Sequence, residues 1–108
     1  MVYVIREGGA YSYKIQESRD GTMRILDEGK GFQSMGDALT YVEKMKKAIA
    51  TNGIGQTRDP LLRTFGYQIA EQSGNVLSEE SGWATLEDIN EHIAYIKKAI
   101  VEGVKTIL

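Results

Sequence analysis

Apolar and polar residues alternate along two stretches of the chain that can be aligned with each other. Residues 11–17 read Tyr-Ser-Tyr-Lys-Ile-Gln-Glu, and residues 65–71 read Phe-Gly-Tyr-Gln-Ile-Ala-Glu. A period of two is typical of a half-buried β-strand, because successive side chains point to opposite faces of a sheet. The turn formers Asp20-Gly21 and Gly74-Asn75 follow these stretches. We therefore predict two β-hairpins, with second strands over residues 22–26 and 76–79.

A further strand is predicted ahead of the first hairpin only. Residues 2–6 are mainly apolar and precede the turn formers Gly8-Gly9. The corresponding place in the second half holds residues 57–60, which show no strand pattern. The first half is therefore predicted to contain three strands and the second half two.

Each hairpin is followed by a segment with helical periodicity. Apolar residues recur at three-and-four spacing, first at Met35, Ala38, Leu39, Val42, Met45 and Ile49, and then at Leu86, Ile89, Ile93, Ile96 and Ile100, continuing towards Val104 and Ile107. This spacing predicts two amphipathic helices that each bury one stripe. Ser34-x-x-Asp37 and Thr85-x-x-Asp88 supply N-terminal caps. Asn52-Gly53 and Gly103 are stop signals.

The two halves also match around the helices. Gly31-Phe32 aligns with Gly82-Trp83 just before the helix starts, and MKKAI at residues 45–49 aligns with IKKAI at residues 96–100. We interpret the chain as one folding unit written twice. The predicted organisation is a single domain of two repeats, βββα over residues 1–50 and ββα over residues 57–108, with a linker at residues 51–63. The predicted fold class is α+β: a twisted, mainly antiparallel sheet with both helices packed on one face.

Composition excludes several classes of protein. The chain has 108 residues, 42% of them hydrophobic and 26% charged, with a net charge of -2, which argues against a dedicated nucleic-acid binder and against an acidic DNA mimic. It has no cysteine, so thiol catalysis, disulfides and thiolate metal sites are excluded. The first residues, MVYVIREGG, form neither a signal peptide nor a membrane span. We expect a cytoplasmic protein with no membrane partner.

The sequence resembles the YegP-like family of small tandem-repeat proteins. The resemblance covers the opening VYVIREGGAYSYKIQESRDG, the GKGFQS and SGWAT segments before the helices, and the lysine pairs near the helix ends. It implies two strand-rich units that each end in a helix, and no established activity.

Side chains capable of catalysis are scattered. His92 is the only histidine, and Tyr41 occupies the aligned position in the first helix, so we interpret His92 as structural. The acids Asp27, Glu28, Glu79 and Glu80 sit at predicted strand ends and are interpreted as solvated charges rather than a carboxylate pair. Nucleophile, phosphate-loop and dinucleotide motifs are absent. We expect no enzyme, no cofactor and no metal.

Aromatic and basic residues are the candidates for binding. Phe32 and Trp83 either pack on the first helical turns or serve as exposed anchors for a partner. Four tyrosines lie on strands and could stack bases on an open sheet face: Tyr3, Tyr11, Tyr13 and Tyr67. The lysine pairs suit the negative ends of the helix dipoles, and the alternative is that an acidic or phosphate-bearing partner bridges both pairs. These are Lys46, Lys47, Lys97 and Lys98.

The leading functional prediction is a non-enzymatic interaction or regulatory module that acts as a homodimer. An uncovered sheet face, or an overhang of Val104, Ile107 and Leu108, would leave apolar surface for a symmetric contact. A phage-type inhibitor and a small-ligand sequestering protein belong to the same class, and a protein partner of unknown identity is expected. Single-stranded nucleic-acid binding through the sheet tyrosines is the alternative, and it is not favoured because the basic residues are interspersed with acids.

Overall fold

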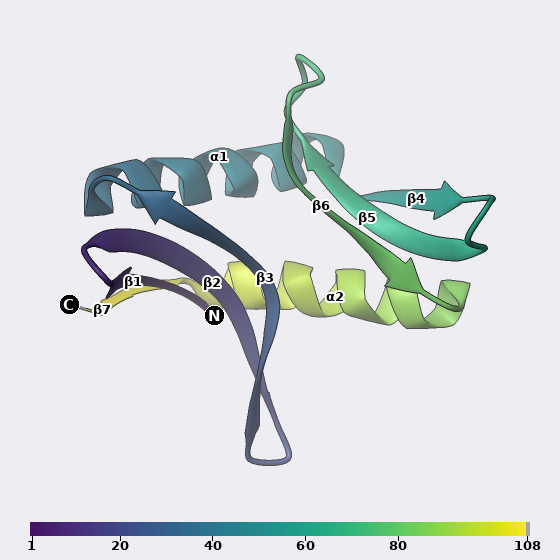
Figure 1. Cartoon of the computed structure of the whole chain (residues 1–108), viewed down its shortest axis with the longest axis horizontal. Helices are drawn as coiled ribbons and strands as arrows, with labels where there is room; N and C mark the ends of the chain where they lie inside the picture. The colour runs from purple at the N-terminus through teal and green to yellow at the C-terminus, as the bar shows by residue number, and fades with distance from the viewer. Residues whose placement is uncertain (108) are drawn as a thin grey trace. The chain divides into compact units, whose positions relative to one another are not determined.

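The fold was analysed in a computed structural model that describes residues 1–107. Within these residues the chain forms two helices and seven strands (Figure 1), which confirms the α+β class. In chain order they are β1 Val2–Glu7, β2 Ala10–Arg19, β3 Thr22–Phe32, α1 Met35–Asn52, β4 Gly55–Asp59, β5 Thr64–Ala70, β6 Val76–Trp83, α2 Leu86–Glu102 and β7 Val104–Ile107.

The strands form two sheets instead of the single sheet that we expected. The first has the order β3-β2-β1-β7, and the second has the order β4-β5-β6. Neighbouring strands are antiparallel except β1 and β7, which are parallel. The hairpin β2–β3 of the first half and the hairpin β5–β6 of the second half therefore belong to separate sheets, whereas β7 of the second half joins the sheet of the first half.

Strand β4 corrects the prediction of a linker at residues 51–63 and of only two strands in the second half. It pairs along its length with β5, with Arg58 opposite Phe65. It is an edge strand and exposes most of its side chains. An edge strand of this kind needs no apolar alternation, so the polar sequence Gly-Gln-Thr-Arg-Asp gave no periodic signal.

Strand β7 corrects the predicted continuation of the second helix. Gly103 adopts a φ of 116° and ends α2, as its stop signal predicted. The chain then runs beside β1, with Val104 opposite Val2. Val104 and Ile107 continue the helical spacing of α2 by coincidence, and their backbone is extended.

The chain divides into two compact units whose boundaries fall inside the helices. Unit 1 comprises Met1–Glu43 and the chain from Tyr95 onward, and unit 2 comprises Lys44–Ala94. Each helix therefore gives its first half to the unit of its own preceding strands and its second half to the other unit. This division of each helix between two units differs from the predicted repeats, in which each whole helix belonged with its preceding strands. That the chain forms a single domain stays a prediction.

Both cores contain residues from both helices. In unit 1 the buried apolar residues are Val2, Val4, Tyr13, Ile15, Leu26, Ala38, Val42, Ile96, Ala99 and Ile100. In unit 2 they are Met45, Ala48, Tyr67, Ile69, Leu77, Ile89 and Ile93. The middle of each predicted stripe is thus buried and serves two cores in succession, whereas Leu86 at the start of α2 is 48% exposed and Met35, Leu39 and Ile49 are half-buried.

The predicted helix starts are confirmed. The Asp37 amide donates to Ser34 Oγ at 3.0 Å, and the Asp88 amide donates to Thr85 Oγ1 at 3.1 Å. These bonds satisfy amides that an isolated helix leaves without partners. Over the described residues neither helix has the length and apolarity that crossing a bilayer requires.

Candidate functional site

Three aromatic rings of unit 1 form a cluster that includes a predicted partner-binding residue. Tyr13 on β2, Phe32 at the end of β3 and Tyr41 on α1 have ring centroids 5.3 to 6.1 Å apart. Such separations are those of favourable aromatic pairs. Phe32 therefore packs against its own unit, as the packing interpretation expects.

The aligned residues of unit 2 form a second cluster. Tyr67 on β5 lies 5.8 Å from Trp83 and 5.5 Å from His92, and the Trp83 and His92 rings are 4.5 Å apart. His92 thus takes the place that Tyr41 has in the first cluster. The lone histidine packs on aromatic rings, in line with a structural role.

Tyr13 and Tyr67 are placed in the cores and cannot present their rings to a partner. Their exposed fractions are 1% and 0%. Tyr11 is half-buried and lines a hollow of about 210 Å³ with Glu7 and Lys30. Two of the four sheet tyrosines proposed for base stacking therefore reach the surface, Tyr3 and Tyr11, and both are half-buried.

The neighbours of Tyr11 form a polar network between β1 and β2. Lys14 Nζ lies 2.8 Å from Glu7 Oε1, and Ser12 Oγ donates to the same oxygen at 3.1 Å. The hydrogen bond from Lys14 lowers the pKa of Glu7, with a smaller contribution from Ser12, and the hydrogen bond to Glu7 raises the pKa of Lys14. These groups satisfy one another, so the hollow offers few spare polar groups.

The candidate acids lie in different surroundings, and the prediction of solvated charges is wrong for Asp27. Asp27 is buried and accepts a 2.7 Å hydrogen bond from the Tyr13 hydroxyl, whereas Glu28 lies 3.7 Å from Lys30 Nζ. Glu79 Oε2 accepts from Gln68 Nε2 at 3.3 Å. A search of residues 1–107 finds no group of three or more acidic or histidine side chains that could hold a metal ion.

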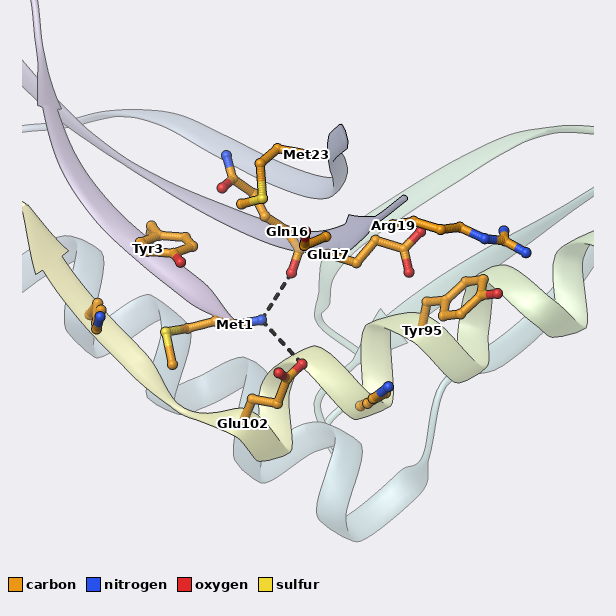
Figure 2. A pocket seen from close by; sticks show the side chains of 11 residues that line it. Met1, Tyr3, Gln16, Glu17, Arg19, Met23, Tyr95 and Glu102 are labelled. Atoms are coloured by element: carbon orange, nitrogen blue, oxygen red, sulfur yellow. Dashed lines mark hydrogen bonds and ion pairs between the residues drawn. The ribbon is translucent and has the colours of Figure 1, made fainter. Parts of the chain in front are cut away.

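A hollow of unit 1 lies between the first sheet and the second half of α2 (Figure 2). Its volume is about 480 Å³. We call it the α2 cavity. Its apolar wall comes from Met1, Tyr3, Met23 and Tyr95, and its remaining lining is polar or charged. It therefore combines flat apolar surface with charge in one concavity.

Two arginines from the β2–β3 hairpin contact Tyr95 in the wall of the α2 cavity, and one of them, Arg19, lines the cavity itself. The guanidinium carbons of Arg19 and Arg24 lie 5.3 and 5.5 Å from the centre of the Tyr95 ring. Arg24 Nη2 is also 2.5 Å from Glu17 Oε1, at ion-pair distance but not aligned as a hydrogen bond. Cation–π and ionic contacts therefore hold these side chains around Tyr95.

The lining of the α2 cavity carries more basic than acidic side chains. Arg19, Lys98 and Lys105 line it together with Glu17 and Glu102. Both glutamates face cations, because Glu17 pairs with Arg24 and Glu102 lies 3.5 Å from the Met1 amine. Lys98 and Lys105 form no ion pair with another described residue. Positive charge is therefore available to a ligand.

Unit 2 has a hollow built from the aligned residues. It measures about 380 Å³ and lies between the second half of α1 and the turn after β5. Lys47 occupies the position of Lys98, and Glu71 occupies the position of Glu17. The second lysine of each predicted pair lines one of these two hollows, whereas Lys46 and Lys97 are not part of their linings.

Sequence reasoning missed most of the α2 cavity. Tyr95, Lys98 and Glu102 are spaced three and four apart, which places them on one face of α2 beside its buried stripe. That spacing was the available signal. Arg19 and Lys105 carried no comparable signal, because a hairpin end and β7 bring them to the cavity.

Comparison with known proteins identifies the fold. No family model matches the chain, and no curated protein matches it. The solution NMR structure of YegP from E. coli, described as a protein of unknown function, matches with a TM-score of 0.67 over 97% of this chain and 90% of that chain. The sequence identity is 9%, so the match concerns the fold. The resemblance is confirmed at that level: the chain has the fold of YegP.

Proposed function

We propose that the protein is a non-enzymatic interaction module that binds a small organic anion in the α2 cavity. The observation that carries the proposal is the excess of basic side chains in a hollow of about 480 Å³, within a chain whose net charge is -2. A volume of this size suits a small organic molecule. The local charge is opposite in sign to that of the whole chain, which favours an anion at this place.

The side chains that line the α2 cavity indicate which chemical groups the ligand should carry. The Arg19 guanidinium suits a carboxylate or phosphate, because its planar fork can donate two parallel hydrogen bonds. Lys98 adds a point charge from α2. Tyr3 and Tyr95 supply aromatic surface for an apolar body. The expected ligand thus has one anionic head and one flat apolar part.

The two carboxylates of the lining support binding rather than catalysis. Glu17 and Glu102 each face a cation, so each serves as a charge partner that positions the basic groups. A general base must instead be within reach of the proton that it removes, with its lone pair available. Sequestration or regulation by the ligand is therefore the role that we propose.

We also propose that the protein forms a homodimer, but through a different surface from the helical overhang that we predicted. Val104 belongs to β7 instead of a helical overhang, and Leu108 lies outside the described residues. Ile5 is opposite Ile107 in the ladder between β1 and β7, and Ile107 is 50% exposed. This apolar pair supports a sheet-mediated contact. The nucleic-acid alternative loses support, because Tyr13 and Tyr67 are core residues.

Titration with phenyl phosphate tests the anion proposal. We expect chemical-shift changes, in protein-observed NMR, at the amides around Arg19 and Lys98, with weaker binding of inorganic phosphate and of neutral benzyl alcohol. Lys98→Glu should weaken binding about tenfold or more, because it reverses one charge at the ligand. Lys97→Glu is the matched control, since it changes net charge equally and does not line the cavity.

The proposal fails under two results. One is the absence of any localised shift with phenyl phosphate, benzoate or inorganic phosphate at about 10 mM. A dissociation constant above this concentration would be too weak for a specific small-ligand site. The other is an equal loss of affinity in Lys97→Glu and Lys98→Glu, which would indicate non-specific attraction. Both variants are at exposed positions, so circular dichroism should show an unchanged fold.

A further inference from the structure

The turn between β4 and β5 exposes two adjacent leucines. Leu61 is 93% exposed and Leu62 is 72% exposed. They occupy the tip of a hairpin in unit 2 (Figure 1). Large apolar side chains that project from a tip are removed from water when they contact an apolar phase. The favourable free energy of this transfer is proportional to the apolar area that is buried.

The backbone amide donors of this tip are already satisfied. Asp59 Oδ1 accepts hydrogen bonds from the amides of Leu61, at 3.0 Å, and Leu62, at 3.2 Å. Pro60 has no amide hydrogen. The three residues at the apex therefore carry no amide donor that needs water. The apex can therefore approach hydrocarbon without the desolvation cost of unpaired amide donors.

Basic side chains flank the leucines. Arg58 precedes the turn and Arg63 closes it, with Asp59 as the one acid between them. The Arg58 guanidinium lies 5.7 Å from the centre of the Phe65 ring, which positions it along the hairpin. The tip thus has net positive charge, although the chain has a net charge of -2.

We propose that the β4–β5 turn is a reversible contact with an anionic bilayer surface. Leu61 and Leu62 enter the boundary of the acyl chains, and Arg58 and Arg63 meet the lipid phosphates. Leucine is under-represented among the hot spots of protein interfaces, and a convex tip with satisfied amides suits a fluid surface. The sequence-based expectation of no membrane partner considered spanning segments, which a surface contact does not need.

Vesicle co-sedimentation tests the contact. We expect the intact chain to sediment with vesicles of phosphatidylcholine and phosphatidylglycerol at three to one, and several-fold less with phosphatidylcholine alone. The double variant Leu61→Ser, Leu62→Ser should reduce the bound fraction about tenfold, because lipid affinity scales with buried apolar area. Arg58→Gln with Arg63→Gln should remove the preference for phosphatidylglycerol.

Val101→Ser is the matched control, because Val101 is 85% exposed but lies on α2, outside the turn. It should bind vesicles like the unchanged chain. The chain has no cysteine, so Leu62→Cys and Val101→Cys each give a single site for an environment-sensitive dye. Only the dye at position 62 should shift its emission to the blue on vesicles.

Three results would overturn the proposal. The first is no sedimentation with the mixed vesicles at low salt. The second is that the Leu61→Ser, Leu62→Ser variant binds as well as the unchanged chain. The third is a blue shift of the dye emission at position 101 instead of position 62. Self-association in the absence of lipid that this double variant abolishes would assign the tip to a protein interface. It would also overturn the membrane contact.

Discussion

The Tyr13 hydroxyl donates a 2.7 Å hydrogen bond to Asp27 Oδ2 between neighbouring strands of unit 1, and both side chains are buried. Tyr13 also stacks on Tyr41, with ring centroids 5.9 Å apart. One tyrosine thus joins the polar and the aromatic parts of this core. A buried carboxyl group without its donor bears a desolvation cost, so the bond has a testable effect on stability.

Tyr13→Phe should lower the free energy of unfolding by about 1.5–3 kcal/mol, the range for hydrogen bonds to charged or buried acceptors. Urea unfolding followed by circular dichroism measures the change. Tyr11→Phe is the control, because Tyr11 is half-buried outside the core, and it should change stability by about 0.5 kcal/mol or less. Equal effects of the two variants would mean that the hydrogen bond contributes little.

Gly29→Ala should destabilise the protein through overpacking. A Cβ atom at Gly29 would collide with the Tyr13 ring, which crosses β3 at this residue. We expect a loss of about 1–3 kcal/mol in the free energy of unfolding. Gly36→Ala is the control, because its Cβ atom has room in α1 and alanine favours a helix, so it should gain about 0.5–1 kcal/mol. A tolerated Gly29→Ala would show that the Tyr13 ring can move away.

The pair of Glu7 and Lys14 predicts a pH dependence of stability. The folded pKa of Glu7 lies below the usual 4.5, so its stabilising contribution is present above about pH 4.5 and is lost as the pH falls through the folded pKa. The folded pKa of Lys14 lies above 10.5, so its contribution is present below about pH 10.5 and is lost as the pH rises through the folded pKa.

Glu7→Gln removes this ionic pair at every pH. The difference in free energy of unfolding between the unchanged chain and Glu7→Gln should be constant near neutrality and shrink as the pH falls below 4.5 and through the folded pKa of Glu7. Lys14→Met should reduce the acid-side dependence in the same way. A difference that does not shrink at all as the pH is lowered from neutrality into the acid range would attribute the effect of Glu7→Gln to packing.

The local structure of this chain was largely predictable because its signals act over a few residues. Ser34 and Thr85 cap helices through bonds to amides three residues on, so sequence spacing alone defines them. Asp20 and Gly21 both adopt positive φ, which is the conformation that their turn chemistry favours. The alternation around Tyr13 and Tyr67 likewise identified the strand faces that are buried.

The arrangement of these elements was not predictable from the same signals. Strand β7 pairs with β1, which lies at the other end of the chain, and no local pattern encodes that choice. The helix dipole alone explains why lysine pairs occur near the helix ends, so the sequence does not distinguish Lys97 from Lys98. The structure distinguishes them, because Lys98 lines the α2 cavity and Lys97 does not. The candidate site depends on the same long-range placement.

The exchange of helix halves leads to a prediction about fragments. Unit 1 takes Ile96, Ala99 and Ile100 from α2, and unit 2 takes Met45 and Ala48 from α1. A fragment of residues 1–54 therefore lacks part of its own core and the strand β7, although it contains one complete predicted repeat. The fragment of residues 55–108 similarly lacks the second half of α1. Neither fragment should bury enough apolar surface to fold alone.

We expect fragments 1–54 and 55–108 to give circular dichroism spectra of largely unfolded chains when separate. An equimolar mixture should regain helical signal and protease resistance, because each fragment supplies the missing helix half of the other unit. The unfolding midpoint of the mixture should rise with concentration, unlike that of the intact chain if it is monomeric. If fragment 1–54 unfolds cooperatively as a monomer, its own residues suffice for a core, and the second half of α2 is then not required to stabilise the first sheet.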